Sequence, residues 1–188
     1  ETDFVEEPTL RSYIFSKLLW NPRLDWNILR RQFVTNYYGK AAKEINKYYN
    51  VIYNESKVKR IAPYIQNVNN STLNDIIKIV DNINMIKLNS PYSERVLDFL
   101  GAIIYSIIRH RNDDLSFTTY YNYSRQLQSY FMDKKIDRLN SGMANPETFL
   151  KMHLIRSNSF LFKNTSKPLR EINSFTVDAS KFIIANGD

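Results

Sequence analysis

Apolar residues recur three or four positions apart along most of this chain, which is the spacing of one face of an α-helix. The clearest stripe follows Ser90-Pro91 and consists of Val96, Leu97, Leu100, Ile104, Ile107 and Ile108. The 188 residues include only four glycines and six prolines, so the chain lacks the turn residues that a strand-rich fold of this length needs. We therefore expect an all-α fold, an antiparallel bundle of about six to eight helices joined by short loops.

Several helix ends are marked by single residues. Acidic Glu6-Glu7 before Pro8 predicts the start of a first helix. Asn21-Pro22 predicts its end, because the residue before a proline avoids the helical region. Asp25 is expected to cap the second helix. Gly39 then marks either a helix end or a close contact between helices.

The later helix limits follow from the same signals. Residues 54–70 predict a short or kinked helix, and Ser71 or Thr72 is expected to cap the one after it. Ser90-Pro91 predicts a cap followed by a proline at the first helical position. A long helix is expected from Ser116 to Leu139, and another from residue 145 to about residue 156.

The chain divides into a helical bundle domain, residues 1–156, and a tail, residues 157–188, that is irregular or extended. The tail either packs on the bundle or leads to another module. A membrane span needs about 20 continuous apolar residues, and the longest apolar run is broken by Asp98, Gly101 and Ser106. The first seven residues carry no signal-peptide pattern, so we expect the chain to be a processed or excised piece.

Residues that carry chemistry are sparse. The chain has no cysteine, and its two histidines, His110 and His153, lie at different expected helix ends. The paired carboxylates are ordinarily helix caps or solvated charges rather than a catalytic pair; they are Glu6-Glu7, Asp113-Asp114, and Asp133 with Asp137. No phosphate-binding, dinucleotide-binding or hydrolase motif occurs. We expect no catalytic residue, cofactor or metal in this chain.

The formal net charge of +7 raises a second possibility, a basic helical module that binds nucleic acid. The residues that would contact phosphate are Arg30, Arg31, Lys40, Lys43, Lys47, Lys57, Lys59 and Arg60. They alternate with asparagine, tyrosine and isoleucine instead of forming a dense block. Nucleic acid is therefore the less favoured partner.

Aromatic rings are the remaining candidates for binding, since exposed rings stack on sugars and on bases. We select Trp20, Trp26, Tyr37 and Tyr38 as candidate carbohydrate or interface contacts. In each Tyr-Tyr pair, one ring is expected to face inward and its neighbour, about 100° around the helix, to lie nearer the rim. A third possibility is an interaction scaffold whose exposed tyrosines dock a protein partner.

The first quarter of the chain carries a pattern that resembles one known family. The matching residues are Tyr13-Ile14, Ser16-Lys17-Leu18-Leu19-Trp20-Asn21-Pro22, Asp25, Phe33, Tyr37-Tyr38-Gly39, Ala41-Ala42, Ile45 and Tyr48-Tyr49. They are similar to the segment that follows the catalytic-type barrel in large bacterial proteins of the domain-of-unknown-function 4838 family. Those proteins look like relatives of barrel glycoside hydrolases such as alpha-glucuronidases and hexosaminidases.

The resemblance implies a non-catalytic helical accessory domain of a secreted, periplasmic or surface protein that acts on carbohydrate. Its partners would be an upstream barrel of the same parent protein and a polysaccharide. No barrel is present in this chain, so the resemblance carries over no catalytic residue. Within this reading, Trp20 is expected to bury its ring and hold the corner, and Trp20→Ala to cost roughly 3 to 5 kcal/mol.

Overall fold

The computed structural model describes residues 8–59, 63–136 and 149. The α-helices in these ranges are α1 (Pro8–Trp20), α2 (Trp26–Tyr38), α3 (Ala42–Lys59), α4 (Asn70–Asn84), α5 (Tyr92–Arg111) and α6 (Phe117–Asp133). Short 3-10 turns join them: η1 (Gly39–Ala41), η2 (Ile65–Asn67) and η3 (Asn112–Asp114). No strand occurs in the described ranges, and the expected all-α class is confirmed. Apart from residue 149, the helix expected from residue 145 lies outside the described residues, as does the tail 157–188.

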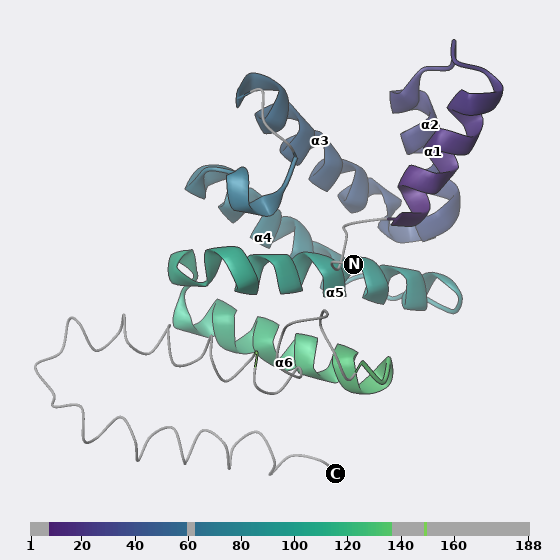
Figure 1. The fold of residues 1–188 in the computed structure, drawn as a ribbon. Helices are drawn as coiled ribbons and strands as arrows, with labels where there is room; N and C mark the ends of the chain where they lie inside the picture. The colour runs from purple at the N-terminus through teal and green to yellow at the C-terminus, as the bar shows by residue number, and fades with distance from the viewer. Residues whose placement is uncertain (1–7, 60–62, 137–148, 150–188) are drawn as a thin grey trace, which may run out of the picture.

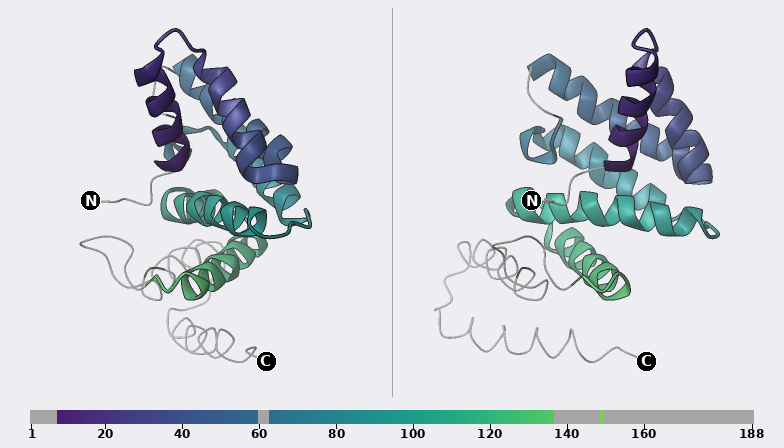
Figure 2. Two further views of the ribbon diagram at one scale, coloured as in Figure 1. Left: turned by 90° about the vertical axis from the view of Figure 1, so that its right-hand side faces the viewer. Right: turned by 45° about the vertical axis from the view of Figure 1, so that its right-hand side comes forward.

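Consecutive helices run in roughly opposite directions and pack as hairpins, α1 with α2, α3 with α4, and α5 with α6 (Figure 1). The central element is α5, which contacts α6 on one side and α2 and η2 on the other. The α1–α2 hairpin stands up from this layer, and its turn points away from α5 and α6 in all three views (Figures 1 and 2).

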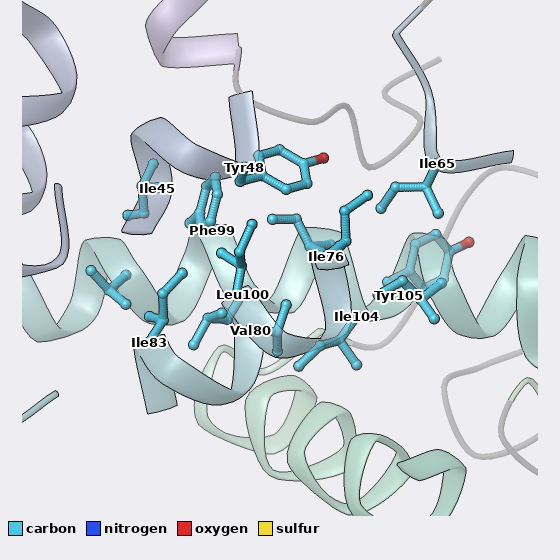
Figure 3. Close-up of a cluster of buried hydrophobic side chains, with 14 of the residues drawn as sticks. Ile45, Tyr48, Ile65, Ile76, Val80, Ile83, Phe99, Leu100, Ile104 and Tyr105 are labelled. Atoms are coloured by element: carbon cyan, nitrogen blue, oxygen red, sulfur yellow. The ribbon is translucent and has the colours of Figure 1, made fainter. Parts of the chain in front are cut away.

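The core lies where α3, α4 and α5 meet (Figure 3). The buried side chains shown there are Ile45 and Tyr48 from α3, Ile76, Val80 and Ile83 from α4, and Phe99, Leu100, Ile104 and Tyr105 from α5. Tyr105 also stacks on Phe149, with ring centroids 5.0 Å apart. The predicted stripe of α5 is the most continuous part of this core, because burial of its apolar face drives the helix into the middle of the bundle.

The first two helix limits are as expected. The carboxylate of Asp25 accepts hydrogen bonds from the backbone N–H of Asn27 at 2.7 Å and of Ile28 at 3.2 Å, so it caps α2. At Gly39 both alternatives hold. This residue ends α2 with a positive φ of 55°, and a Cβ added to it would lie 3.1 Å from Cδ1 of the Tyr92 ring.

Other limits differ from the prediction. The cap of α4 is Asn69, whose Oδ1 accepts from the N–H of Thr72 at 2.8 Å, and neither Ser71 nor Thr72 takes that role. Residues 54–70 do not form one kinked helix, since α3 continues to Lys59 and η2 is separate.

Two helices of the central layer also differ at one end. The first residue of α5 is Tyr92, so Pro91 lies just outside the helix. The last residue of α6 is Asp133, six positions before the expected Leu139. The chain turns there because Lys135 adopts a left-handed φ of 51° and Ile136 N–H bonds back to the Phe131 carbonyl at 2.9 Å. Glycine is the usual residue at such a helix end. Because lysine stands here instead, the sequence did not predict that α6 ends at this point.

Candidate functional site

The four aromatic residues selected from the sequence occupy different environments. The exposed fraction is 92% for Trp20, 39% for Trp26 and 3% for Tyr38, while Tyr37 is half-buried. Tyr37 and Tyr38 contact each other edge to face with ring centroids 5.0 Å apart, whereas Trp26 contacts Tyr53. The structure therefore places the candidates in separate groups rather than in one cleft.

The expectation that Trp20 anchors the corner by burying its ring is wrong. The indole lies at the tip of the α1–α2 hairpin, which projects away from the core (Figure 1). Backbone bonds and the Asn21 side chain hold the corner instead. Asn21 N–H donates to the Lys17 carbonyl at 2.9 Å, and Asn21 Oδ1 accepts from the N–H of Arg23 at 3.1 Å. The turn thus forms without the ring.

Tyr38 belongs to the core, where its ring lies 5.6 Å from that of Phe99. Tyr37 lies nearer the rim, between Phe33, stacked at 4.7 Å, and the guanidinium of Arg95 at 4.3 Å from the ring centroid. Arg95 Nη1 also donates to the Tyr37 carbonyl at 3.2 Å. This pair confirms the expected arrangement of one inward ring and one rim ring.

The same rule fails for a second pair and holds for a third. Tyr48 and Tyr49 are both buried, with exposed fractions of 1% and 5%, because α3 has neighbours on two sides, α2 and α4. Tyr120 is buried while Tyr121 is exposed, as expected.

A polar and aromatic cluster that the sequence did not single out surrounds Arg30. Its guanidinium lies 5.6 Å from the ring centroid of Trp26, 5.7 Å from that of Tyr49 and 5.7 Å from that of Tyr53. Arg30 Nη2 donates to Oδ1 of Asn50 at 2.7 Å. Trp26 and Arg30 come from adjacent turns of α2, and the other members come from the facing turns of α3.

The charge in this cluster is unusual because it is buried without a counter-ion. Arg30 is 4% exposed, and none of the ion pairs between described residues involves it. Its Nε has no hydrogen-bond partner in the described part of the chain. Burial lowers the pKa of the guanidinium, although an arginine stays protonated at any physiological pH. The faces of three rings and one amide oxygen are the groups that offset its desolvation.

This placement corrects the proposed phosphate-binding role of Arg30, since a buried guanidinium among rings cannot meet a nucleic-acid backbone. Two other members of the basic set have acidic partners: Lys47 pairs with Glu44 at 2.6 Å, and Lys59 pairs with Glu55. Arg31, Lys40, Lys43 and Lys57 are exposed, and Arg60 lies outside the described residues. The basic residues on α2 and α3 thus do not act as a single exposed patch.

Groups suited to catalysis or metal binding do not converge among the described residues. No cluster of three or more histidine or acidic side chains that could hold a metal occurs in residues 8–59, 63–136 and 149. Asp114 accepts from Arg111 Nε at 2.7 Å. Burial, followed by the charge of Arg109, lowers the pKa of His110, and His153 lies outside the described residues.

Membrane spanning is a separate question. None of the described helices is both long and apolar enough to span a membrane.

The turn of the α1–α2 hairpin carries a second candidate surface, which we name the apolar tip. It consists of Phe15, Leu19, Trp20 and Leu24, with exposed fractions of 65%, 85%, 92% and 38%. The opposite side of α1 packs inward through buried Leu10 and half-buried Tyr13. α1 thus carries large apolar side chains on its packed side and on its exposed side, next to polar Arg11, Ser12, Ser16 and Lys17. Several large apolar side chains exposed in one region are typical of a contact surface.

Comparison with known proteins finds one family. Residues 4–50 match the family model described as Domain of unknown function (DUF4838). The match covers α1, α2, η1 and the first half of α3, which are the elements that carry the apolar tip and Trp26. The match covers 47 of the 188 residues, so this segment of the chain is similar to that family. No curated protein and no solved structure shows a significant match to the chain.

Proposed function

We propose that this chain is a non-catalytic helical accessory domain of a glycoside-hydrolase-like, carbohydrate-active protein. It packs on a barrel encoded upstream in the same parent protein and helps to shape a carbohydrate cleft. The proposal rests on one observation above others: the apolar tip lies uncovered within the segment that matches the family model. The parent protein would act outside the cytoplasm, in keeping with a polysaccharide substrate.

The composition of α1 supports a packing role. Exposed apolar side chains are common singly, but a group of large ones in one region marks a surface that contacts another body. Phe15 and Leu19 lie one turn apart on α1, and Trp20 follows at the end of the same helix. The hairpin projects from the bundle, so its tip can reach a neighbouring module without disturbing the core (Figure 2).

Trp26 supports the carbohydrate side of the proposal. Part of its indole is solvent-exposed, and the Tyr53 ring contacts it edge to face, with centroids 5.2 Å apart. A ring held in place by a neighbour loses little conformational freedom when a sugar stacks on it. Trp26 is therefore a better sugar contact than Tyr38, which is buried.

Hydrogen exchange in the parent protein tests the packing role. We expect the amides of α1 to exchange more slowly in the full polypeptide than in the isolated chain, while those of α6 stay the same. Trp20→Lys in the parent should return α1 to the faster exchange. Equal exchange of α1 in both contexts, or a gene that encodes no barrel, would contradict the proposal.

Two further measurements examine the isolated chain. Hydrolysis of a panel of aryl glycosides should show no turnover above that of a blank, since catalysis is assigned to the barrel. Clear turnover would overturn the non-catalytic assignment. Sedimentation should show a monomer, and a stable oligomer dissociated by Trp20→Lys would instead favour the interaction scaffold.

A further inference from the structure

We infer that the surface on which the apolar tip packs is an apolar hollow rimmed by carboxylates. The inference rests on the proposed function, because it specifies the chemistry of the partner surface within the same parent protein. It is carried by four exposed cations that lie beside the apolar tip, which we name the basic rim. They are Arg11, Lys17, Arg23 and Arg31.

The α1–α2 hairpin concentrates the positive charge of the chain. Residues 8–38 contain five basic side chains and one acidic side chain, a net charge of +4, whereas the whole chain carries +7. None of the ion pairs between described residues involves a member of the basic rim. The one carboxylate, that of Asp25, already accepts from the backbone N–H of Asn27 and of Ile28. The hairpin therefore offers cations that no carboxylate of the described residues neutralises.

The basic rim borders exposed apolar side chains on both helices of the hairpin. On α1, Arg11, Phe15 and Leu19 follow one another at intervals of four residues, so they share the exposed side of the helix. On α2, exposed Ile28 and exposed Arg31 are three positions apart and share a side in the same way. Both helices thus present apolar side chains near the turn and an arginine farther from it. An apolar centre with a polar rim is the usual arrangement of a protein–protein interface.

The exposed indole of Trp20 has a cation on each side of it in the sequence, Lys17 three positions before and Arg23 three positions after. Lys17 Nζ lies 5.7 Å from the ring centroid of Tyr13, and the backbone N–H of Arg23 donates to Asn21 Oδ1 at 3.1 Å. Neither contact neutralises a charge. A partner that covers the indole must therefore also meet two cations, and carboxylates are the protein groups that pair with them.

The length of this surface favours a protein partner over a membrane. Arg11 lies nine positions before Trp20, so about 13.5 Å of the α1 axis separates them. An amphipathic helix at a membrane buries its apolar face only about 5–10 Å deep. A protein wall alongside the hairpin can contact the whole series, from the indole to the outermost arginine. Because the hairpin projects from the bundle, such a wall can reach it (Figure 2).

The test measures hydrogen exchange of the α1 amides and takes the ratio of the rate in the isolated chain to the rate in the parent protein. The test variant combines Lys17→Glu with Arg23→Glu. Because it loses two ion pairs and gains two repulsive contacts, the ratio should fall about tenfold. The control variant combines Lys78→Glu with Lys87→Glu, which makes the same change of charge at exposed positions of α4 and of the loop after it. The control should leave the ratio unchanged.

A second measurement varies the salt concentration. In NaCl at about 1 M the Debye length is about 3 Å, so exposed charges are screened from one another. The ratio for the wild type should therefore fall, since the attraction to carboxylates is lost. The ratio for the Lys17→Glu, Arg23→Glu variant should rise, since its repulsion is screened as well. A wild-type ratio that salt leaves unchanged would mean a purely apolar contact and would overturn the inference without any variant having to fold.

The remaining outcomes separate this inference from the proposed function. An unchanged ratio in the Lys17→Glu, Arg23→Glu variant would overturn the carboxylate rim and leave the packing role intact. Equal exchange of α1 in the isolated chain and in the wild-type parent would refute both. The parent protein should not cosediment with vesicles made of equal parts phosphatidylserine and phosphatidylcholine. Cosedimentation that the same variant abolishes would assign the apolar tip to an anionic membrane and would overturn the inference.

Discussion

Gly101 of α5 and Tyr130 of α6 are packed so closely that no side chain fits between them. A Cβ added to Gly101 would lie 2.7 Å from Cε1 of Tyr130 and 2.8 Å from two more ring atoms. Both residues are buried in the interface between the two helices. The glycine thus sets the distance between α5 and α6.

Gly101→Ala should lower the free energy of unfolding, because the added methyl group forces the Tyr130 ring out of its position at a cost of about 1–3 kcal/mol. Alanine is about 1 kcal/mol more favourable than glycine in a helix, so the expected net loss is up to about 2 kcal/mol. Chemical denaturation followed by circular dichroism gives the value. Gly101→Ala made in a Tyr130→Leu background should cost less than in the wild type, because the ring that the methyl group meets is gone. If the effects of the two substitutions on the free energy of unfolding are strictly additive, the contact does not set the packing of the helices.

Arg111 joins the end of α5 to the segment before α4. Its guanidinium donates to the Val68 carbonyl, to Asn70 Oδ1 and to Asp114 Oδ2. Arg111→Met should cost about 2–3 kcal/mol of unfolding free energy, since it leaves a partly buried carbonyl and a carboxylate without their donor. The exposed Lys78→Met is the control, with an expected change within about 0.5 kcal/mol. Equal effects of the two variants would show that the hydrogen bonds of Arg111 do not stabilise the fold.

The helices with a continuous stripe of apolar residues were predicted from the sequence, because burial of one helix face requires apolar residues three or four positions apart. Of the stripe expected for α5, Leu97 is partly buried and the others are buried: Val96, Leu100, Ile104, Ile107 and Ile108. Capping by Asp25 was also predictable, because it depends on residues two and three positions away. Signals between residues so close in sequence can be recognised without knowing how the rest of the chain packs.

The features that sequence reasoning missed depend on distant parts of the chain. Arg30 looked like a surface cation, and what buries it comes from α3, including Asn50 twenty positions later. Trp20 was expected to be an anchor because large rings are usually buried, yet at the tip of the projecting hairpin no described residue covers it. The spacing of Trp26 and Arg30, one turn apart, was the one local signal of the cluster.

Trp20→Ala should leave the free energy of unfolding within about 0.5 kcal/mol of wild type, because the ring makes little contact in the isolated chain. A buried tryptophan would instead cost about 3–5 kcal/mol. Thermal melting of the two proteins gives the difference. Phe33→Ala, which removes a buried ring of α2, is the matched comparison and should melt far earlier. A large loss for Trp20→Ala would mean that the indole is covered in solution.

Stability should fall at alkaline pH. Burial, followed by the charge and hydrogen bond of Asp98, raises the pKa of Tyr130 from 10.0 to about 12. Burial also raises the pKa of Tyr123, which donates to Asp81 at 3.4 Å. A folded pKa above the unfolded one means that the stabilisation is complete below about pH 10 and is lost as pH rises through the folded pKa. Unfolding free energies measured from pH 9 to 12 should decline, and Tyr130→Phe should reduce the slope while exposed Tyr121→Phe leaves it unchanged.

Arg30→Met should unfold within about 1 kcal/mol of wild type. Loss of the three cation–π contacts is offset by removal of a desolvated charge, and the thioether keeps contact with the same rings. Arg30→Ala, which leaves a cavity, should cost about 2 kcal/mol or more. Chemical denaturation of both variants separates the effect of losing the charge from the effect of losing side-chain volume on the free energy of unfolding. If Met and Ala are equally damaging, the guanidinium itself holds α2 on α3. A stable Met variant would instead show that the packing of the side chain, and not its charge, holds α2 on α3.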